Sequence, residues 1–374
     1  MRFLHTSDWQ LGKPFGRAPA EARSAFQEAR LDVIDTIAVA ARQNNAPAVL
    51  VAGDVFDNSE PGDRVFRQAL VRMKAAPDMT WFLLPGNHDP ARADGLWSRL
   101  SGEAPANVRP CLQVATVELA PDCFLLPAPL QFKRSLEDPT AWFDTAEIPA
   151  GAQRIGLAHG SIQDFGSSDP ATNLIAPDRA RRSGLDYLAL GDWHGRRQID
   201  PRTHYSGTPE ADDFGRETTG VVLLIDLPAA GAEPLVSEIP TGRYAWMDTA
   251  WQLSDAASLE GLVAALAPGI ERKNLVARLT LSGLVTLAER VAIHDRLAEH
   301  LANDIRWLDL RMTDLYCRPT DHDLAEIDAH GVLRNAAERL LAQSAEPGPQ
   351  GRQAAAALER LYVEHKRAQR LAVL

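Results

Sequence analysis

Five short polar clusters in the first 194 residues carry the side chains best suited to chemistry. They combine carboxylates, imidazoles and side-chain amide oxygens, which suit hard and borderline divalent cations such as manganese, iron, zinc and magnesium. A pair of such ions, held by about seven or eight ligands with one bridging carboxylate, hydrolyses phosphate esters. The clusters hold that many candidates: Asp8-Trp9-Gln10, Gly53-Asp54-Val55-Phe56-Asp57, Gly86-Asn87-His88-Asp89, His159-Gly160 and Gly191-Asp192-Trp193-His194.

Each cluster directly follows a short apolar run that predicts a β-strand. The run at residues 48–52 is apolar throughout, which is typical of a strand covered on both faces. Apolar residues at helical spacing predict helices over 21–44 and 63–76. Ligands of α/β sheets bind beyond the carboxyl ends of the strands. We therefore expect the clusters to meet at one rim, since they follow runs at 2–6, 48–52, 81–84, 155–158 and 187–190.

After residue 233, turn signals begin and a different pattern of strands and helices follows. Helices expected over 258–267 and 287–303 alternate with strands over 275–281 and 305–312, which predicts a small α/β domain. Two further helices are expected over 321–344 and 350–371, separated by the breaker Glu346-Pro347-Gly348-Pro349. We therefore predict three parts, at residues 1–233, 234–320 and 321–374.

The composition of the 374 residues is that of a globular protein, with 45% hydrophobic and 24% charged residues, which excludes a disordered or fibrous chain. The sequence has no apolar run of 18 residues and no secretory signal pattern, so we expect no membrane span and a cytoplasmic protein. Its three cysteines form no CxxC pair, which argues against a disulfide framework or zinc–thiolate site. Because the net charge is −11, binding to nucleic acid would depend on a local basic patch or on metal ions.

The ordered set of motifs resembles that of the calcineurin-like metallophosphoesterases. The finer details resemble their DNA-repair branch, the SbcD nuclease and its relatives that partner SMC-type ATPases. The segments that carry this resemblance are HTSDWQLGKPF, GDVFDNSEP, LLPGNHDP and YSGTPE with FGRE. They fall within residues 1–227, and the remainder of the chain is similar only in layout.

The resemblance implies an α/β fold, a four-layer αββα sandwich followed by a small α/β cap domain and a C-terminal helical tail. It also implies two metal positions that share Asp54. The first-metal group would be Asp8, Gln10, Asp54 and His194, and the second-metal group would be Asp54, Asn87, His159 and Asp192. His88 would face the scissile phosphate as general acid or transition-state stabiliser, with Asp57 orienting it.

Two positions depart from the family pattern. Gln10 stands where the family usually has histidine, and Asp192 stands where it has the first histidine of GHxH. Both changes favour oxygen ligands, so manganese is the expected metal, with magnesium and iron as alternatives to it. A neutral amide is also a weaker donor than imidazole, so the first-metal position is expected to be weaker.

The basic residues Lys13, Arg196 and Arg197 lie near the motifs and are candidates for contacts to substrate phosphates, with a solvated loop as the alternative. His5 is expected to pack or hydrogen-bond beneath the sheet end. His204 is expected to be structural, with substrate contact as the alternative.

The tail carries two apolar stripes. SbcD-like nucleases grip their ATPase with a C-terminal helical segment, so these stripes could dock a partner or could pack on each other. The first consists of Leu333, Ala337, Leu340 and Leu341, and the second of Leu358, Leu361 and Tyr362. A homodimer is expected by analogy with the family.

The main hypothesis is a two-metal DNA phosphodiesterase, an exonuclease and also an endonuclease of DNA repair, working with an SMC/SbcC-like ATPase. One alternative is a small-molecule phosphodiesterase or phosphatase, which the acidic net charge favours and the long C-terminal extension disfavours. The other alternative is a metal-poor scaffold that binds DNA ends for the ATPase.

Overall fold

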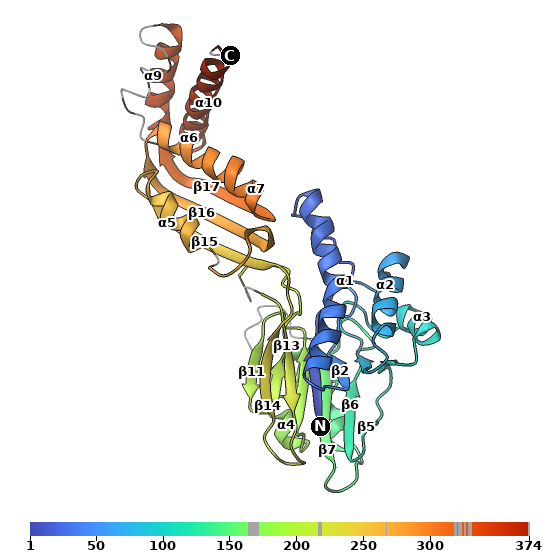
Figure 1. Cartoon of the computed structure of the whole chain (residues 1–374). Coiled ribbons are helices and arrows are strands. Elements are labelled where there is room, and N and C mark those ends of the chain that lie inside the picture. The colour runs from blue at the N-terminus through green and yellow to red at the C-terminus, as the bar shows by residue number, and fades with distance from the viewer. Residues whose placement is uncertain are drawn as a thin grey trace. The chain divides into compact units, whose positions relative to one another are not determined.

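The structure is a computed structural model that describes residues 1–163, 172–215, 219–266, 268–317, 320, 324, 327 and 331–372. It divides into two compact units, Met1–Trp246 and Met247–Leu374. Figure 1 shows the elements of both units in chain order. Within the described part of the chain, no helix combines the length and the apolar composition that a membrane crossing requires.

Two six-stranded mixed sheets form the centre of the first unit. The first sheet has the order β14-β13-β1-β2-β3-β4, in which β1 to β4 are parallel, β13 pairs antiparallel with β1, and β14 pairs antiparallel with β13. Its strands are β1 (Arg2–Thr6), β2 (Ala48–Val51), β3 (Thr80–Leu83), β4 (Val108–Pro110), β13 (Val221–Asp226) and β14 (Leu235–Pro240).

The second sheet has the order β11-β12-β10-β7-β6-β5, with parallel pairing from β12 to β6 and antiparallel strands at both edges. Its strands are β5 (Val117–Ala120), β6 (Cys123–Ala128), β7 (Gln153–His159), β10 (Tyr187–Gly191), β11 (Arg197–Asp200) and β12 (Thr203–Tyr205). The short strands β8 (Ser161–Ile162) and β9 (Leu174–Ile175) pair separately beside it.

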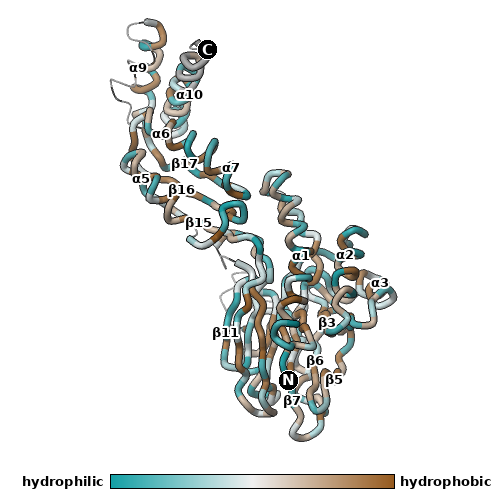
Figure 2. The backbone as a smooth tube through the Cα atoms, in the orientation of Figure 1, coloured by the Kyte–Doolittle hydropathy of each residue, from teal (hydrophilic) through white to brown (hydrophobic). Residues whose placement is uncertain are grey.

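The two faces of each central strand pack into different cores, because successive side chains of a strand point in opposite directions. In β2, Val49 and Val51 pack against α1 (Ala20–Gln43) and α2 (Asp63–Lys74), whereas Leu50 packs toward the second sheet. In β10, Ala189 joins the core between the sheets, while Leu188 packs toward η1 (Ala141–Asp144) and α4 (Arg179–Arg182). The helix α3 (Leu96–Glu103) joins the α1 side. Helices thus cover both sheets on their outer faces, as the four-layer prediction requires, and Figure 2 shows the hydrophobic runs along the central strands.

The first unit extends to Trp246, beyond the boundary that we expected after residue 233. Residues 235–240 form β14 and pair with β13, which ties them to the first sheet. Tyr244 and Trp246 then pack against the ring of Phe26 on α1. The turn at Glu233-Pro234 is therefore a connection between two antiparallel strands of one sheet.

The second unit contains a three-stranded sheet of β15 (Ala245–Leu253), β16 (Leu275–Val285) and β17 (Trp307–Cys317). The helix α5 (Ser258–Ala265) packs on it together with a helical segment over 287–304, which is divided into α6 (Leu287–Asp295), the π-helix η3 (Arg296–Leu301) and α7 (Ala302–Asp304). The short η2 (Arg272–Asn274) precedes β16. The α6 helix begins at a capping box between Thr286 and Glu289. The predicted alternation of strands and helices in this region is confirmed.

The tail forms two helices, α9 (Val332–Ser344) and α10 (Pro349–Ala372), and residues 321–323, where we expected the first helix to begin, lie outside the described residues. The two apolar stripes pack together with Leu287 of α6: Ala337, Leu358 and Tyr362 are buried, and Leu340, Leu341 and Leu361 are partly buried. Leu333 stays 43% exposed. Most of the surface of the two stripes is therefore buried within the second unit, which agrees with the alternative that the stripes pack on each other.

Two histidines are buried in the first unit just beneath the strand ends. His5 places Nδ1 2.9 Å from the Tyr187 hydroxyl and Nε2 3.2 Å from the Leu190 carbonyl oxygen. His204 stacks on the Tyr187 ring and is 4% exposed, so it is structural. Burial lowers the pKa of His5 to about 3, with a further contribution from the His204 charge, and burial lowers the pKa of His204 to about 4.

These lowered pKa values predict a loss of stability in mild acid. The unfolded chain, in which both imidazoles have ordinary pKa values near 6.5, binds more protons than the folded chain. Their contribution is therefore complete above that pH and is lost as the pH falls toward the folded values. For His5 the loss is about 2 kcal/mol between pH 7 and pH 5. Urea denaturation at a series of pH values should show it, with a shallower pH dependence for His5→Gln. His294→Gln, at an exposed site on α6, is the control, and an unchanged slope in His5→Gln would contradict the assignment.

Candidate metal centre

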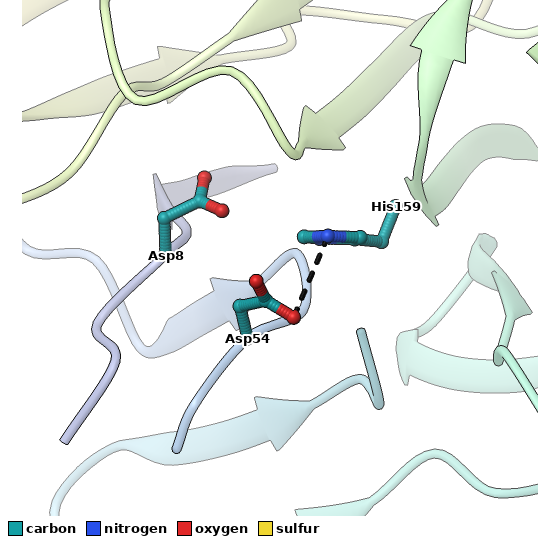
Figure 3. Close-up of side chains that lie close together, drawn as sticks. All are labelled: Asp8, Asp54 and His159. Atoms are coloured by element: carbon teal, nitrogen blue, oxygen red, sulfur yellow. Dashed lines mark ion pairs between the residues drawn. The ribbon is translucent and has the colours of Figure 1, made fainter. Parts of the chain in front are cut away.

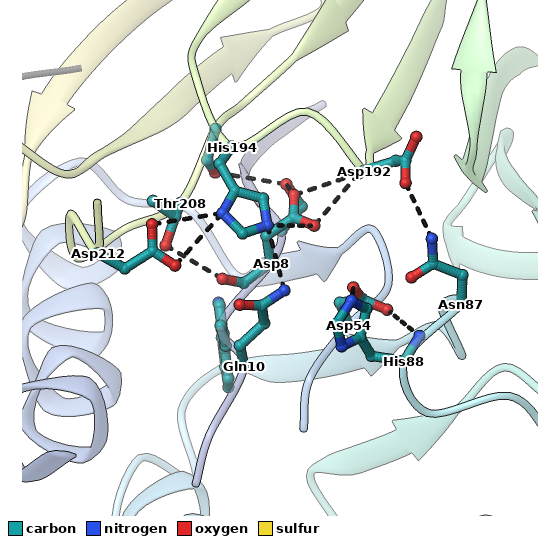
Figure 4. Close-up of polar contacts among 12 residues, drawn as sticks. Asp8, Gln10, Asp54, Asn87, His88, Asp192, His194, Thr208 and Asp212 are labelled. Carbon is teal, nitrogen blue, oxygen red and sulfur yellow. Dashed lines mark hydrogen bonds and ion pairs between the residues drawn. The ribbon is translucent and has the colours of Figure 1, made fainter. Parts of the chain in front are cut away.

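The carboxyl ends of β1, β2, β3, β7 and β10 bring the five polar clusters together at one rim, as predicted. Main-chain hydrogen bonds tie the loops to one another: Asp8 N donates to Gly53 O at 3.1 Å, and Gln10 N donates to Asp54 O at 2.9 Å. The main-chain N–H of Asp192 donates to both carboxylate oxygens of Asp8 at 3.2 Å, which joins the second sheet to the first (Figure 4).

Four of the candidate ligands have a left-handed backbone, with φ values of 54° at Asp8, 41° at Gln10, 53° at Asp54 and 101° at Asp192. Non-glycine residues rarely adopt this conformation, and it costs of the order of 1 kcal/mol or more at each position. The surrounding hydrogen bonds hold the strained turns in place. The strained backbone positions are therefore those whose side chains lie at the candidate metal centre, at the ends of their strands.

Asp8, Asp54 and His159 form the centre of the site, with one ligand atom from each within 4.8 Å of the others (Figure 3). All three are buried. His159 Nδ1 lies 2.9 Å from the Ala52 carbonyl oxygen and donates to it, and Nε2 faces Asp54 Oδ1 at 3.5 Å. Among the described residues, no hydrogen-bond donor reaches His159 Nε2 or the buried Asn87 Oδ1. Buried polar atoms without a hydrogen-bond partner are costly, and two of them beside carboxylates fit a bound cation.

The buried carboxylates of this centre also favour a positive charge beside them. Burial lowers the pKa of His159, but the carboxylates of Asp54, Asp8 and Asp192 outweigh it and raise the pKa to about 9. Burial raises the pKa of the Asp8 carboxyl. Buried carboxylates require a hydrogen-bonded or charged partner, and a divalent cation supplies one.

Asp192 completes the second-metal group from the second sheet. Its Oδ1 accepts a hydrogen bond from Asn87 Nδ2 at 3.1 Å and lies 3.7 Å from His159 Nε2. Its Oδ2 accepts from Ser161 Oγ at 2.6 Å. The four members of this group therefore face one another, and their oxygen-rich donor set fits a hard divalent ion.

The first-metal group is arranged differently. His194 Nε2 lies 3.9 Å from Asp8 Oδ1 but only 3.1 Å from the side-chain nitrogen of Gln10. His194 Nδ1 faces the buried carboxylate of Asp212 at 3.3 Å, and Lys13 contacts both Asp212 and Gln10. The structure thus brings Gln10 and His194 to the rim, in contact with each other.

Two carboxylates that were not predicted from the sequence support the site. Asp89 is fully buried and accepts hydrogen bonds from Gly86 N at 2.8 Å and Phe56 N at 2.9 Å, which clamps the β2 and β3 loops together. Asp212 binds the buried guanidinium of Arg30 at 2.6 Å. Burial would raise the pKa of Asp212, but Arg30, His194 and Lys13 hold it well below its usual range. Asp89 was visible as the last residue of GNHD, whereas the sequence around Asp212 carries no comparable signal.

His88 lies at the edge of the site and is 39% exposed at its side chain, so a substrate can reach it. Its main-chain N–H donates to Asp54 Oδ1 at 2.9 Å, and its Nδ1 lies 2.9 Å from the main-chain carbonyl oxygen of Asp57. Asp57 therefore contacts His88 through its main-chain carbonyl oxygen. The ring nitrogen Nε2 is left facing the site, 4.0 Å from Asp54 Oδ2.

The cations proposed for substrate contacts are partly engaged within the protein. Lys13 Nζ forms an ion pair with Asp212 Oδ2 at 2.5 Å, and Arg196 pairs with Glu238 at 3.1 Å on the surface. Arg197 begins β11 and is exposed. Arg216 and Glu217 of the FGRE segment lie outside the described residues.

Comparisons with known proteins agree with this geometry. A family model described as calcineurin-like phosphoesterase matches residues 1–225. The chain is 25% identical to the SbcD subunit of the nuclease SbcCD from Bacillus subtilis over 329 aligned positions, which cover 70% of this chain and 81% of that protein. It is 36% identical to the SbcD subunit from Escherichia coli K12 over 93 positions, 24% of this chain and 21% of the relative. It is 26% identical to the DNA double-strand break repair protein Mre11 of Aeropyrum pernix, over 65% of this chain and 61% of that protein.

The close approach of the β2 and β3 loops leaves no room for a side chain at residue 86. A Cβ on Gly86 would lie 2.1 Å from Asp54 Oδ1 and 2.4 Å from Asp54 N. We predict that Gly86→Ala displaces Asp54 and weakens Mn²⁺ binding by about tenfold or more, as measured by calorimetric titration of the metal-free protein. Gly62→Ala is the matched control, because a Cβ there meets nothing within 4 Å. A folded Gly86→Ala variant with unchanged Mn²⁺ affinity would contradict the role of this loop.

Proposed function

The chain belongs to the calcineurin-like phosphoesterases, on the branch of SbcD and Mre11, and on that premise we propose that it is a metal-dependent DNA phosphodiesterase. It acts as an exonuclease and also as an endonuclease in DNA repair. The observation that carries the proposal is the buried cluster of Asp8, Asp54 and His159, with the unpaired His159 Nε2 directed into it.

In this proposal the first-metal and second-metal groups hold two divalent ions that share Asp54, and manganese is the expected metal. Bound divalent ions would polarise the phosphoryl oxygen and supply a nucleophilic water at neutral pH. Asp8, Asp54 and Asp192 provide the negative charge that retains the ions, and Asn87 and His159 contribute neutral donors. The oxygen-rich donor set supports manganese or magnesium over zinc.

His88 acts on the phosphate from the edge of the site. Its Nδ1 donates to the Asp57 carbonyl oxygen, which leaves Nε2 facing the site, and in the protonated imidazole Nε2 would donate a hydrogen bond or a proton toward the leaving oxygen. Its exposure supports this role, since the ligands beneath it are buried whereas His88 meets solvent.

A polynucleotide substrate is supported by the surface beside the site. Residues 132–134 place an exposed Phe132 next to exposed Lys133 and Arg134, neither of which forms an ion pair with any described residue. Leu130 O accepts a hydrogen bond from Ala91 N at 2.8 Å, which ties this segment to the loop that bears His88. An aromatic side chain with adjacent cations is the usual platform for single-stranded DNA.

The proposed partners are DNA and an SMC/SbcC-like ATPase, together with a second copy of the chain, and the proposed place of action is the cytoplasm. The second unit would serve as the DNA-binding-like cap, and the tail would dock the ATPase. Because the tail stripes are largely buried, the docking surface would include Val332 and Leu333, which are 82% and 43% exposed at the start of α9.

The experiment that tests the function is Mn²⁺-dependent cleavage of end-labelled single- and double-stranded DNA, with a small phosphodiester assayed beside it. His88→Ala is expected to lower the DNA cleavage rate by about 100-fold or more, the usual contribution of a positioned proton donor. His294→Ala, at the exposed site on α6, is the control. Asp57→Ala keeps the main-chain carbonyl and is expected to cost much less than His88→Ala.

Turnover of the small diester without cleavage of any DNA would overturn the nuclease proposal in favour of a small-molecule phosphodiesterase. Binding of DNA ends with neither activity would instead favour the scaffold.

A further inference from the structure

The side chains around Gln10 form a closed ring of hydrogen bonds on the first-metal side of the site. We propose that this ring, which we call the Gln10 latch, holds the first-metal group closed. The chain would then bind one divalent ion tightly in the second-metal group and a second ion only weakly, after the latch opens. The proposal concerns the same site as the proposed function and rests on it.

The ring has four members: Asp212, His194, Gln10 and Lys13. His194 Nδ1 lies 3.3 Å from Asp212 Oδ1, and His194 Nε2 lies 3.1 Å from Gln10 Nε2. Lys13 Nζ closes the ring, at 3.2 Å from Gln10 Oε1 and 2.5 Å from Asp212 Oδ2. Figure 4 shows His194 between Gln10 and Asp212.

The ring fixes the orientation of the Gln10 amide. An ammonium group only donates hydrogen bonds, so Lys13 requires the amide oxygen on its side and the NH₂ group on the side of His194. In the neutral imidazole, Nδ1 donates to Asp212 and Nε2 accepts from this NH₂ group. Every contact then pairs one donor with one acceptor, so the arrangement is self-consistent.

This orientation works against a metal in the first-metal group. The atom of Gln10 that could bind a cation is its oxygen, and that oxygen is turned toward Lys13. The lone pair of His194 Nε2 is used by the Gln10 amide. A metal ion can enter only if the amide turns over and the contact with Lys13 breaks, and the nearby ammonium charge adds repulsion.

The second-metal group is built in the opposite way. His159 Nε2 and Asn87 Oδ1 are buried and have no hydrogen-bond partner among the described residues, so no hydrogen bond must break before they bind an ion. The ring, in contrast, is anchored from beneath by Arg30, which is 1% exposed and lies 2.6 Å from Asp212. The two metal positions therefore differ in the hydrogen bonds that must break before an ion can bind.

The test is the number and affinity of bound Mn²⁺ ions, measured by calorimetric titration of the full-length, metal-free chain with Mn²⁺ alone. The wild-type protein is expected to bind one ion tightly and a second about 10- to 100-fold more weakly, the range by which groups around a metal ligand change its affinity. In Gln10→His the amide is replaced by an imidazole donor, so the second affinity should rise toward the first.

Lys13→Met provides a second, independent variant. It releases the Gln10 oxygen and removes the ammonium charge, while the ion pair between Arg30 and Asp212 is retained. The affinity for the second ion should rise in it as well. Lys74→Met, at an exposed lysine of α2 in the same unit, is the matched control and should bind Mn²⁺ as the wild type does.

Two ions of equal affinity in the wild type, or no tightly bound ion, would overturn the proposal. A second affinity that stays unchanged in both Gln10→His and Lys13→Met would also overturn it. Because the readout is metal binding, these outcomes are independent of whether the protein cleaves DNA. If the chain binds Mn²⁺ as described but cleaves only small diesters, the proposal of the Gln10 latch is supported and the proposal of a nuclease is refuted.

Discussion

The buried carboxylates of Asp8 and Asp54 are the constraint on which the site depends. Two negative charges out of contact with water, beside an imidazole whose Nε2 has no donor among the described residues, are stable only with a cation or a bound proton nearby. The surrounding structure maintains this arrangement although it strains the backbone. It keeps four candidate ligands in a left-handed backbone and brings the Gly86 loop against Asp54 so closely that no Cβ fits. Asp89, itself a buried carboxyl, clamps the same loops.

The two-sheet fold makes this convergence possible. The first sheet supplies Asp8, Asp54 and the loop of Asn87 and His88 from three adjacent parallel strands, and the second supplies His159 and Asp192 from a parallel pair. The sheets are joined at the rim by the bonds from Asp192 N to Asp8 and from His159 Nδ1 to Ala52 O. Each metal group takes side chains from both sheets: Asp54 and His159 lie in the second-metal group, and Gln10 and His194 lie in the first.

The five strands that end in polar clusters, and the convergence of those clusters, could be predicted from the sequence because both depend on local rules. Continuous apolar runs mark buried strands, and parallel strands bring the residues at their carboxyl ends to one rim. The contacts of Asp212, Arg30 and Lys13 could not be predicted, since they depend on which distant side chains the packing brings together. The contact between Asp57 and His88 uses a main-chain carbonyl, which no residue type reveals. The extent of the first unit was missed for a related reason: β14 is assigned by its pairing with β13, whereas its sequence shows only a turn before it.

The most direct test of the account is a crystal structure of the full-length chain soaked with Mn²⁺, with the ions located by their anomalous scattering. We expect a strong peak among Asp54, Asn87, His159 and Asp192, and a weaker peak, or none at low Mn²⁺ concentration, beside Gln10 and His194. Equally strong peaks at both positions would contradict the latch. The absence of any peak next to Asp54 would contradict the central claim that these buried carboxylates are a metal centre.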